Sequence, residues 1–152
     1  MTSPIDALDP VHDCRGTELA NEIAQDLAPR TTSYFQIWAS DEEGHKRAVM
    51  SADEPIYGSQ YLPRKFKIGI AHPADNSIDV LTQDVGFVPV VVDGRADGSV
   101  WDFYSGGGLG QTHNNAATAP HLGLYLGRIR RDQVVAASRA GSTRSAASAS
   151  IW

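Results

Sequence analysis

Residues 86–104, GFVPVVVDGRADGSVWDFY, contain two strand-like segments joined by a turn. Residues 86–92 are almost continuously apolar, which is typical of a strand that is buried on both faces. Two Asp-Gly pairs between residues 93 and 98 supply the residue types that tolerate the backbone angles of tight turns. Residues 99–104 follow with aromatic side chains that favour a strand. This stretch therefore predicts a β-hairpin.

Three more segments upstream have regular patterns. Residues 65–71, KFKIGIA, alternate between two faces and predict a strand. Residues 33–39 and 47–50 are strand-like and are separated by a short polar run, so we expect another hairpin there. Residues 17–28 carry apolar side chains every four residues, which predicts an amphipathic helix.

The downstream part combines a glycine cluster at 106–110 with a helical pattern that begins at 131. The order helix, hairpin, strands, hairpin, helix predicts an α+β fold with a mixed or antiparallel sheet and flanking helices. We expect residues 1–16 to form an irregular lead-in and residues 17–135 to form the domain. Residues 136–152 are rich in Ala and Ser without apolar periodicity, so we expect a low-complexity tail that does not pack.

Composition excludes several classes of protein. The chain has 152 residues and a net charge of −5, which argues against a nucleic-acid-binding protein. The single cysteine, Cys14, excludes an internal disulfide and a self-contained iron–sulfur site. The N-terminus lacks a signal-peptide pattern, and no apolar stretch is long enough to span a membrane. We therefore expect a cytoplasmic protein without a membrane partner.

Two lysines form the first candidate site. Lys65 and Lys67 share one face of the predicted strand, because side chains alternate along it. The small residues Gly69 and Ala71 follow on that face and would leave room for a ligand. An anion would relieve the repulsion between the lysines, and Arg64 beside them could bind a carboxylate. The alternative is an ordinary amphipathic strand with its lysines in water.

The glycine cluster forms the second candidate site. Gly106, Gly107 and Gly108 permit a close approach of the backbone to a ligand, and successive N–H groups can hold an anion. His113 follows the cluster and is the one histidine that we associate with it. The alternatives are a plain glycine-rich turn and a histidine without a role. The five histidines show no helical metal-binding spacing, and we predict no metal ligands.

Several motifs together resemble one protein family, the sulfite reductase haemoproteins and their ferredoxin-dependent sulfite and nitrite reductase relatives. The motif that carries most of the resemblance is YLPRKFK at 61–67. The other segments that resemble the family, in the same order along the chain, are LAPRTTSYFQIW (27–38), EPIYG (54–58), AHPADNSIDVLTQDVGFVPV (71–90) and GGGLGQTH (106–113).

The resemblance implies a specific chemistry. Family members bind sirohaem, whose iron is bridged to a [4Fe–4S] cluster, and reduce sulfite to sulfide or nitrite to ammonia. By the resemblance, Lys65 and Lys67 face the substrate anion and help to supply protons. Arg64 lies near the carboxylates of the cofactor, and the glycine loop with His113 approaches the macrocycle. The implied fold is one half of the sirohaem domain, and the implied electron donor is ferredoxin or an NADPH flavoprotein.

The chain also departs from the family pattern, because the cluster cysteines lie in a later part of family chains and Cys14 cannot replace them. We therefore expect a fragment of a sulfite reductase that is inactive alone. The alternatives are a non-catalytic remnant or module that binds an anion or a tetrapyrrole, and an unrelated α+β domain. A lone half-domain would expose apolar sheet surface, so we expect the isolated chain to be oligomeric or prone to aggregation.

Overall fold

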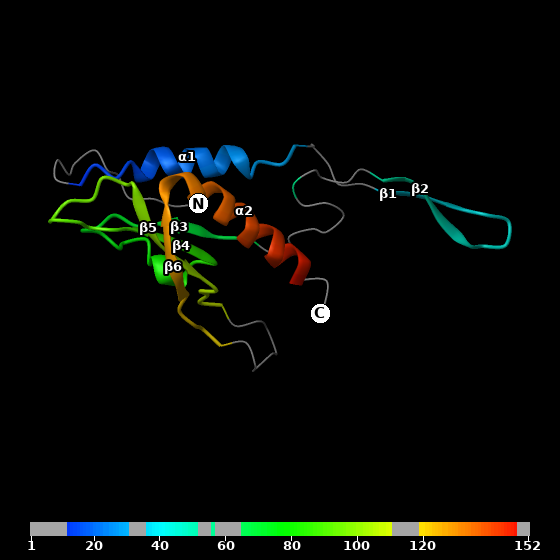
Figure 1. Ribbon diagram of the computed structural model, residues 1–152. Coiled ribbons are helices and arrows are strands. Elements are labelled where there is room, and N and C mark those ends of the chain that lie inside the picture. The colour runs from blue at the N-terminus through cyan, green and yellow to red at the C-terminus, as the bar shows by residue number, and fades with distance from the viewer. Residues whose placement is uncertain (1–11, 31–35, 52–55, 57–64, 111–118, 149–152) are drawn as a thin grey trace.

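The computed structural model describes residues 12–30, 36–51, 56, 65–110 and 119–148. Two helices, one short 3-10 helix and six strands occur in these residues (Figure 1). In chain order they are α1 (Gly16–Asp26), β1 (Gln36–Ser40), β2 (Lys46–Ser51), β3 (Ile68–Ile70), η2 (Val80–Thr82), β4 (Val85–Pro89), β5 (Val100–Ser105), β6 (Leu124–Arg130) and α2 (Arg131–Ser148). The predicted α+β class is confirmed.

Four strands form one mixed sheet in the order β3-β4-β5-β6. Strands β3 and β4 are parallel, whereas β4, β5 and β6 are successively antiparallel. The hairpin predicted from residues 86–104 is confirmed as β4 and β5, with Val92 and Arg95 hydrogen-bonded across its turn. Gly94 and Gly98 in the connection have positive φ angles, as expected for these turn positions.

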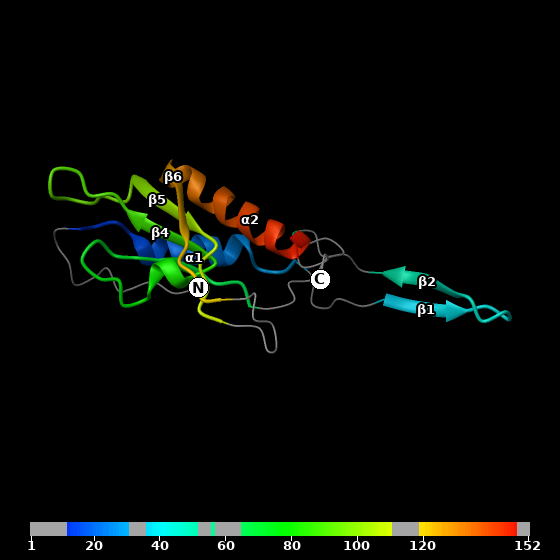
Figure 2. The same cartoon turned by 90° about the horizontal axis from the view of Figure 1, so that it is seen from below.

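The hydrophobic core lies between the sheet and the two helices, which cover the same face of the sheet (Figures 1 and 2). Leu19 and Ile23 of α1 are fully buried, so the predicted apolar stripe is confirmed. The sheet contributes Phe87 and Trp101, and α2 contributes Val134. Trp101 is fully buried and donates its indole N–H to the Gly98 carbonyl at 2.8 Å, which leaves no unpaired polar atom on its ring.

The C-terminal segment differs from the expected unpacked tail. Helix α2 runs from Arg131 to Ser148, and Ser138 and Ser142 on it are buried. Their hydroxyls donate to carbonyl oxygens of the preceding helical turn, at 2.9 Å and 3.0 Å. A hydroxyl satisfied within its own helix is buried at little cost. Ser138 and Ser142 therefore continue the buried stripe that begins at Val134. A search for apolar periodicity does not find this stripe, because serine does not count as an apolar residue.

The second predicted hairpin is also present, as β1 and β2 paired antiparallel. Figure 2 shows this pair extending away from the four-stranded sheet and the helices. Ile37, Trp38 and Val49 on it are each more than half exposed. None of the described helices is long and apolar enough to cross a membrane.

Replacement of Ser138 tests the packing of α2. Ser138→Asp places a carboxylate in a fully buried position, whereas Ala140→Asp places the same group on an exposed position of the same helix. We expect Ser138→Asp to lower the free energy of unfolding by about 2 kcal/mol more than Ala140→Asp, because a buried charge lacks solvation. Urea unfolding followed by circular dichroism measures the difference. Equal stability of the two variants would show that this part of the chain does not pack.

The exposed apolar side chains of strand β6 allow a test of the expected self-association. Leu124, Tyr125 and Leu126 are all more than half exposed on it, and among the described strands it pairs with β5 alone. An exposed apolar edge strand promotes association. We expect the chain to sediment as oligomers at micromolar concentration and Leu124→Lys with Leu126→Lys to shift it toward monomer. The same double lysine change at the exposed Thr17 and Gln25 of α1 is the control. A monodisperse wild-type monomer would contradict the prediction.

Candidate functional site

The two candidate lysines lie directly before β3, in an extended segment. Lys65 and Lys67 are exposed, whereas Phe66 between them is half-buried and packs against the core. The Lys67 carbonyl accepts a hydrogen bond from the Val85 N–H at 3.1 Å, so the pairing with β4 begins one residue before β3 itself. The burial of Phe66 therefore turns both lysines toward solvent, as the alternating pattern predicts.

The room predicted beside the lysines is absent further along the strand. A Cβ atom added to Gly69 would lie 2.7 Å from Gln83 Cγ and 3.2 Å from Ile78 Cδ1, and Ala71 is buried. The chain's own segment around η2 thus fills the face that Gly69 and Ala71 share. The prediction that a ligand lies against these small residues is wrong.

Asp84 joins the lysine segment to the glycine loop. Its Oδ2 accepts a hydrogen bond from the Lys67 N–H at 2.8 Å. Its main-chain carbonyl accepts from the Gly106 N–H at 2.9 Å and from the Ser105 hydroxyl at 3.1 Å. The hydrogen bond from the Lys67 N–H to the carboxylate is charge-assisted, and such bonds are stronger than those between neutral groups. One residue therefore brings together two candidate segments that lie about 40 positions apart in sequence.

Two glycines of the loop make close contacts within the chain. A Cβ atom on Gly107 would lie 2.3 Å from the Leu81 carbonyl oxygen, so only glycine fits there. Gly108 exchanges two main-chain hydrogen bonds of 2.9 Å with His121. The N–H groups of Gly106 and Gly108 thus bond to the chain's own carbonyls, and the binding of a cofactor by Gly106, Gly107 and Gly108 stays a prediction. Gly106 itself is exposed, with a φ of +88° and open space where a side chain would be.

The structure brings together only part of the predicted site. Lys65, Lys67, Gly106, Gly107 and Gly108 all lie at the same end of the sheet, where β3 and β4 begin and β5 ends. The predicted cofactor-binding residues Arg64 and His113 lie outside the described residues.

Sequence reasoning missed the role of Asp84. It sits directly before the apolar segment at 85–89 and 17 positions after Lys67, and this spacing carries no recognisable motif. The signal that could have found it is the pairing of the predicted strands. A parallel pair places the residue before one strand beside the residue before the other.

The chemistry available at this end of the sheet is cationic and polar. Each lysine ammonium carries three donors, so the pair can hold the oxygens of a small oxyanion. Both side chains reach water, which screens their mutual repulsion and leaves them free to move toward a ligand. The described residues here include no thiol and no imidazole other than His121.

A cavity of about 730 Å³ lies elsewhere and shares none of these residues. It is lined mostly by charged side chains near the N-terminal ends of α1 and α2. Its charges are paired in part, with Arg131 on Glu22 at 2.7 Å and Arg15 on Glu18 at 3.7 Å. This cavity therefore does not complete the lysine site.

Comparison with known proteins agrees with the resemblance carried by the motifs. Residues 11–140 match the family described as the nitrite and sulphite reductase 4Fe-4S domain. Over 119 residues the chain is 46% identical to a protein of Geobacillus kaustophilus named sulfite reductase (NADPH) hemoprotein beta-component. The matched region covers 78% of this chain and 20% of that protein. A protein of Bacillus subtilis with the same name is 45% identical over 117 residues, which is 77% of this chain and 20% of the relative. The chain thus spans about a fifth of the length of these relatives, and it belongs to the nitrite and sulphite reductase 4Fe-4S domain family.

Proposed function

We propose that this chain supplies the substrate-facing cations of a sulfite reductase, with Lys65 and Lys67 directed at the sulfite anion. The observation that carries the proposal is the placement of the two lysines. Both are exposed on one side of an extended segment whose main chain is fixed by Phe66 packing and by the Asp84 carboxylate. The sulfite reductase names of the relatives support sulfite as the substrate, and nitrite is the alternative within the family.

The roles of the lysines follow from their charge. Two ammonium groups attract an oxyanion and neutralise the charge that builds up on its oxygens during reduction. An oxygen that departs as water takes up two protons, and the two ammonium groups can each donate one and be reprotonated from solvent. Sirohaem, when bound, supplies the electrons and the position for the substrate atom that is reduced. The lysines hold the anion and deliver protons.

The described residues fit a tetrapyrrole with carboxylate groups. Lys65 and Lys67 offer cations, and the open side of Gly106 offers a surface without a side chain. We therefore propose sirohaem as the haem-type cofactor. A [4Fe–4S] cluster does not fit, because it needs four thiolates and the chain has one cysteine, Cys14, which is buried in the core.

The single cysteine also favours a second candidate function. A chain with these lysines and no cluster ligands would bind an anion or a tetrapyrrole without catalysing six-electron reduction alone. Cluster ligands would then come from another part of a longer protein or from another chain. An NADPH-dependent flavoprotein as the electron donor is also part of the proposal, and the word NADPH in the names of the relatives supports it. A cytoplasmic location completes the proposal.

Removal of the two lysines tests the proposed site. We expect purified wild-type chain to shift the Soret band of added sirohaem, and the Lys65→Ala, Lys67→Ala double variant to bind at least tenfold more weakly, because two cations facing the cofactor are lost. Absorption titration measures the affinity. Lys46→Ala with Arg47→Ala removes two exposed cations from β2 and is the matched control.

Two results would contradict the proposal. The first is an unshifted spectrum with a folded wild-type chain, which would mean that the chain does not bind the cofactor by itself. The second is equal weakening by both double variants, which would mean that net charge and not the position of Lys65 and Lys67 decides binding.

Addition of sulfite to the complex separates cofactor binding from substrate binding by the lysines. Sulfite should perturb the wild-type spectrum more than that of the lysine variant.

Replacement of Asp84 tests the hydrogen bond that positions Lys67. Asp84→Ala removes the acceptor at 2.8 Å from the Lys67 N–H. We expect the Lys67 amide to exchange with deuterium at least tenfold faster, which corresponds to about 1.4 kcal/mol for a hydrogen bond to a charged acceptor. Asp84→Asn keeps one oxygen acceptor and should have a smaller effect, and the exposed Asp13→Ala should have none. Unchanged exchange at Lys67 in Asp84→Ala would show that the carboxylate does not hold this segment.

A further inference from the structure

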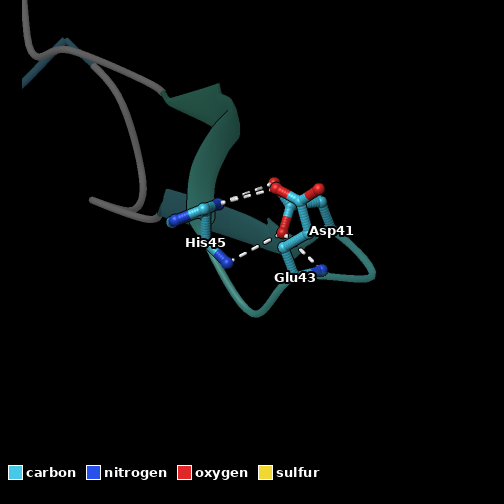
Figure 3. Close-up of polar contacts among 3 residues, drawn as sticks. All are labelled: Asp41, Glu43 and His45. Atoms are coloured by element: carbon cyan, nitrogen blue, oxygen red, sulfur yellow. Dashed lines mark hydrogen bonds and ion pairs between the residues drawn. The ribbon is translucent and has the colours of Figure 1, made fainter.

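Three side chains that can ligate a metal meet at the tip of the β1–β2 hairpin. Asp41, Glu43 and His45 lie in the turn between the strands, and Figure 3 shows the imidazole of His45 directed at both carboxylates. His45 Nδ1 is 3.5 Å from Asp41 Oδ2 and 3.6 Å from Glu43 Oε2. One ligand atom from each of the three residues lies within 4.8 Å of the others.

His45 Nδ1 faces a carboxylate oxygen of Asp41 and one of Glu43. An imidazole nitrogen and carboxylate oxygens are ligand atoms for a divalent transition-metal ion. Among the described residues, the ion pairs of the Asp41 and Glu43 carboxylates are with His45. Glu42 adds a third negative charge to the same turn. With Lys46 and Arg47, which follow on β2, residues 41–47 carry a net charge of −1, which favours a cation over an anion at the tip.

The spacing of the ligand atoms matches a coordination shell. Ligands bound to zinc at about 2.1 Å with tetrahedral angles are roughly 3.4 Å apart. The two nitrogen–oxygen distances of 3.5 Å and 3.6 Å are close to this edge length. An ion can thus enter between the three side chains with small shifts of the Asp41 and Glu43 carboxylates.

The two oxygens of the Asp41 carboxylate have separate tasks. Oδ1 accepts hydrogen bonds from the main-chain N–H groups of Glu43 at 3.1 Å and His45 at 2.8 Å. The Asp41 N–H donates to the His45 carbonyl at 3.0 Å and closes the turn, in which Gly44 has a φ of +85°. Oδ2 stays directed at the imidazole. One of the three ligands, the Asp41 carboxylate, is therefore already held by the main chain before an ion binds.

We propose that Asp41, Glu43 and His45 bind a divalent transition-metal ion of the zinc class. One imidazole with two carboxylates suits zinc, whereas calcium and magnesium prefer oxygen donors alone. Three protein ligands leave at least one position of the ion open. All three side chains are more than half exposed, so that position is open to water or to a donor from another molecule. This site is separate from the lysine site and does not depend on the proposed function.

Zinc titration of the full chain tests the proposal, with backbone amide signals of ¹⁵N-labelled protein as the readout. We expect zinc chloride to shift the signals of residues 41–45 with a single affinity. Glu43→Gln and His45→Ala should each weaken this affinity at least tenfold. Glu42→Gln makes the same charge change on the neighbouring exposed residue and should stay within twofold of wild type. His121→Ala removes another exposed histidine and should leave these shifts unchanged.

Two outcomes would overturn the proposal. The first is that the signals of residues 41–45 do not move at millimolar zinc in the wild-type chain. The second is that Glu43→Gln and Glu42→Gln weaken binding equally, which would mean a diffuse attraction to the acidic turn. Because both glutamate changes lie on an exposed turn and keep the side-chain shape, the fold is not at risk in either variant. Magnesium chloride at the same concentration should leave the signals in place, and equal shifts with magnesium would also contradict a zinc-class site.

Discussion

The segment from Val80 to Asp84 is the constraint on which the rest of the sheet depends. It packs against the face of the sheet opposite the helices, at a distance that only glycine permits. Cβ atoms on Gly86 and Gly107 would lie 2.8 Å and 2.3 Å from carbonyl oxygens of this segment. The close approach lets its carbonyls accept from Gly106 and Gly123, at 2.9 Å and 2.7 Å. The ends of four strands are thereby tied to one short turn, and the lysine segment is tied to it as well.

This arrangement explains why the sequence predicts half of the site well. The alternation of Lys65, Phe66 and Lys67 is a local property, because burial of one aromatic ring settles which way its neighbours point. The partner that fixes Lys67 is not local. Asp84 acts through a side chain that crosses to a parallel strand, and no pattern along the chain marks such a contact. The strands were therefore predictable and the residue that positions the lysines was not.

The errors have one physical origin, which is that small residues have two opposite uses. Gly69 and Gly107 leave space, and that space is either offered to a ligand or filled by the chain itself; here Gln83 and Leu81 fill it. The expectation that the Ala/Ser segment does not pack is an error of the same kind. The Ser138 hydroxyl is bonded within its own helix, so this side chain packs like an apolar group. Hydropathy does not distinguish a small residue that leaves space for a ligand from one that is packed against the chain itself. The residues that surround it in the tertiary structure decide between the two.

The two helices that cover the sheet come from opposite ends of the chain. Arg131 and Arg139 of α2 form ion pairs with Glu22 and Asp26 of α1, across sequence separations of 109 and 113 residues. Ribosomes add about 5–20 residues per second, so roughly 5–20 s separate the synthesis of the two helices. During that interval Leu19 and Ile23 have no cover, and the sheet is still incomplete. The apolar stripe of α1 therefore stays uncovered until α2 has been made and packs beside it.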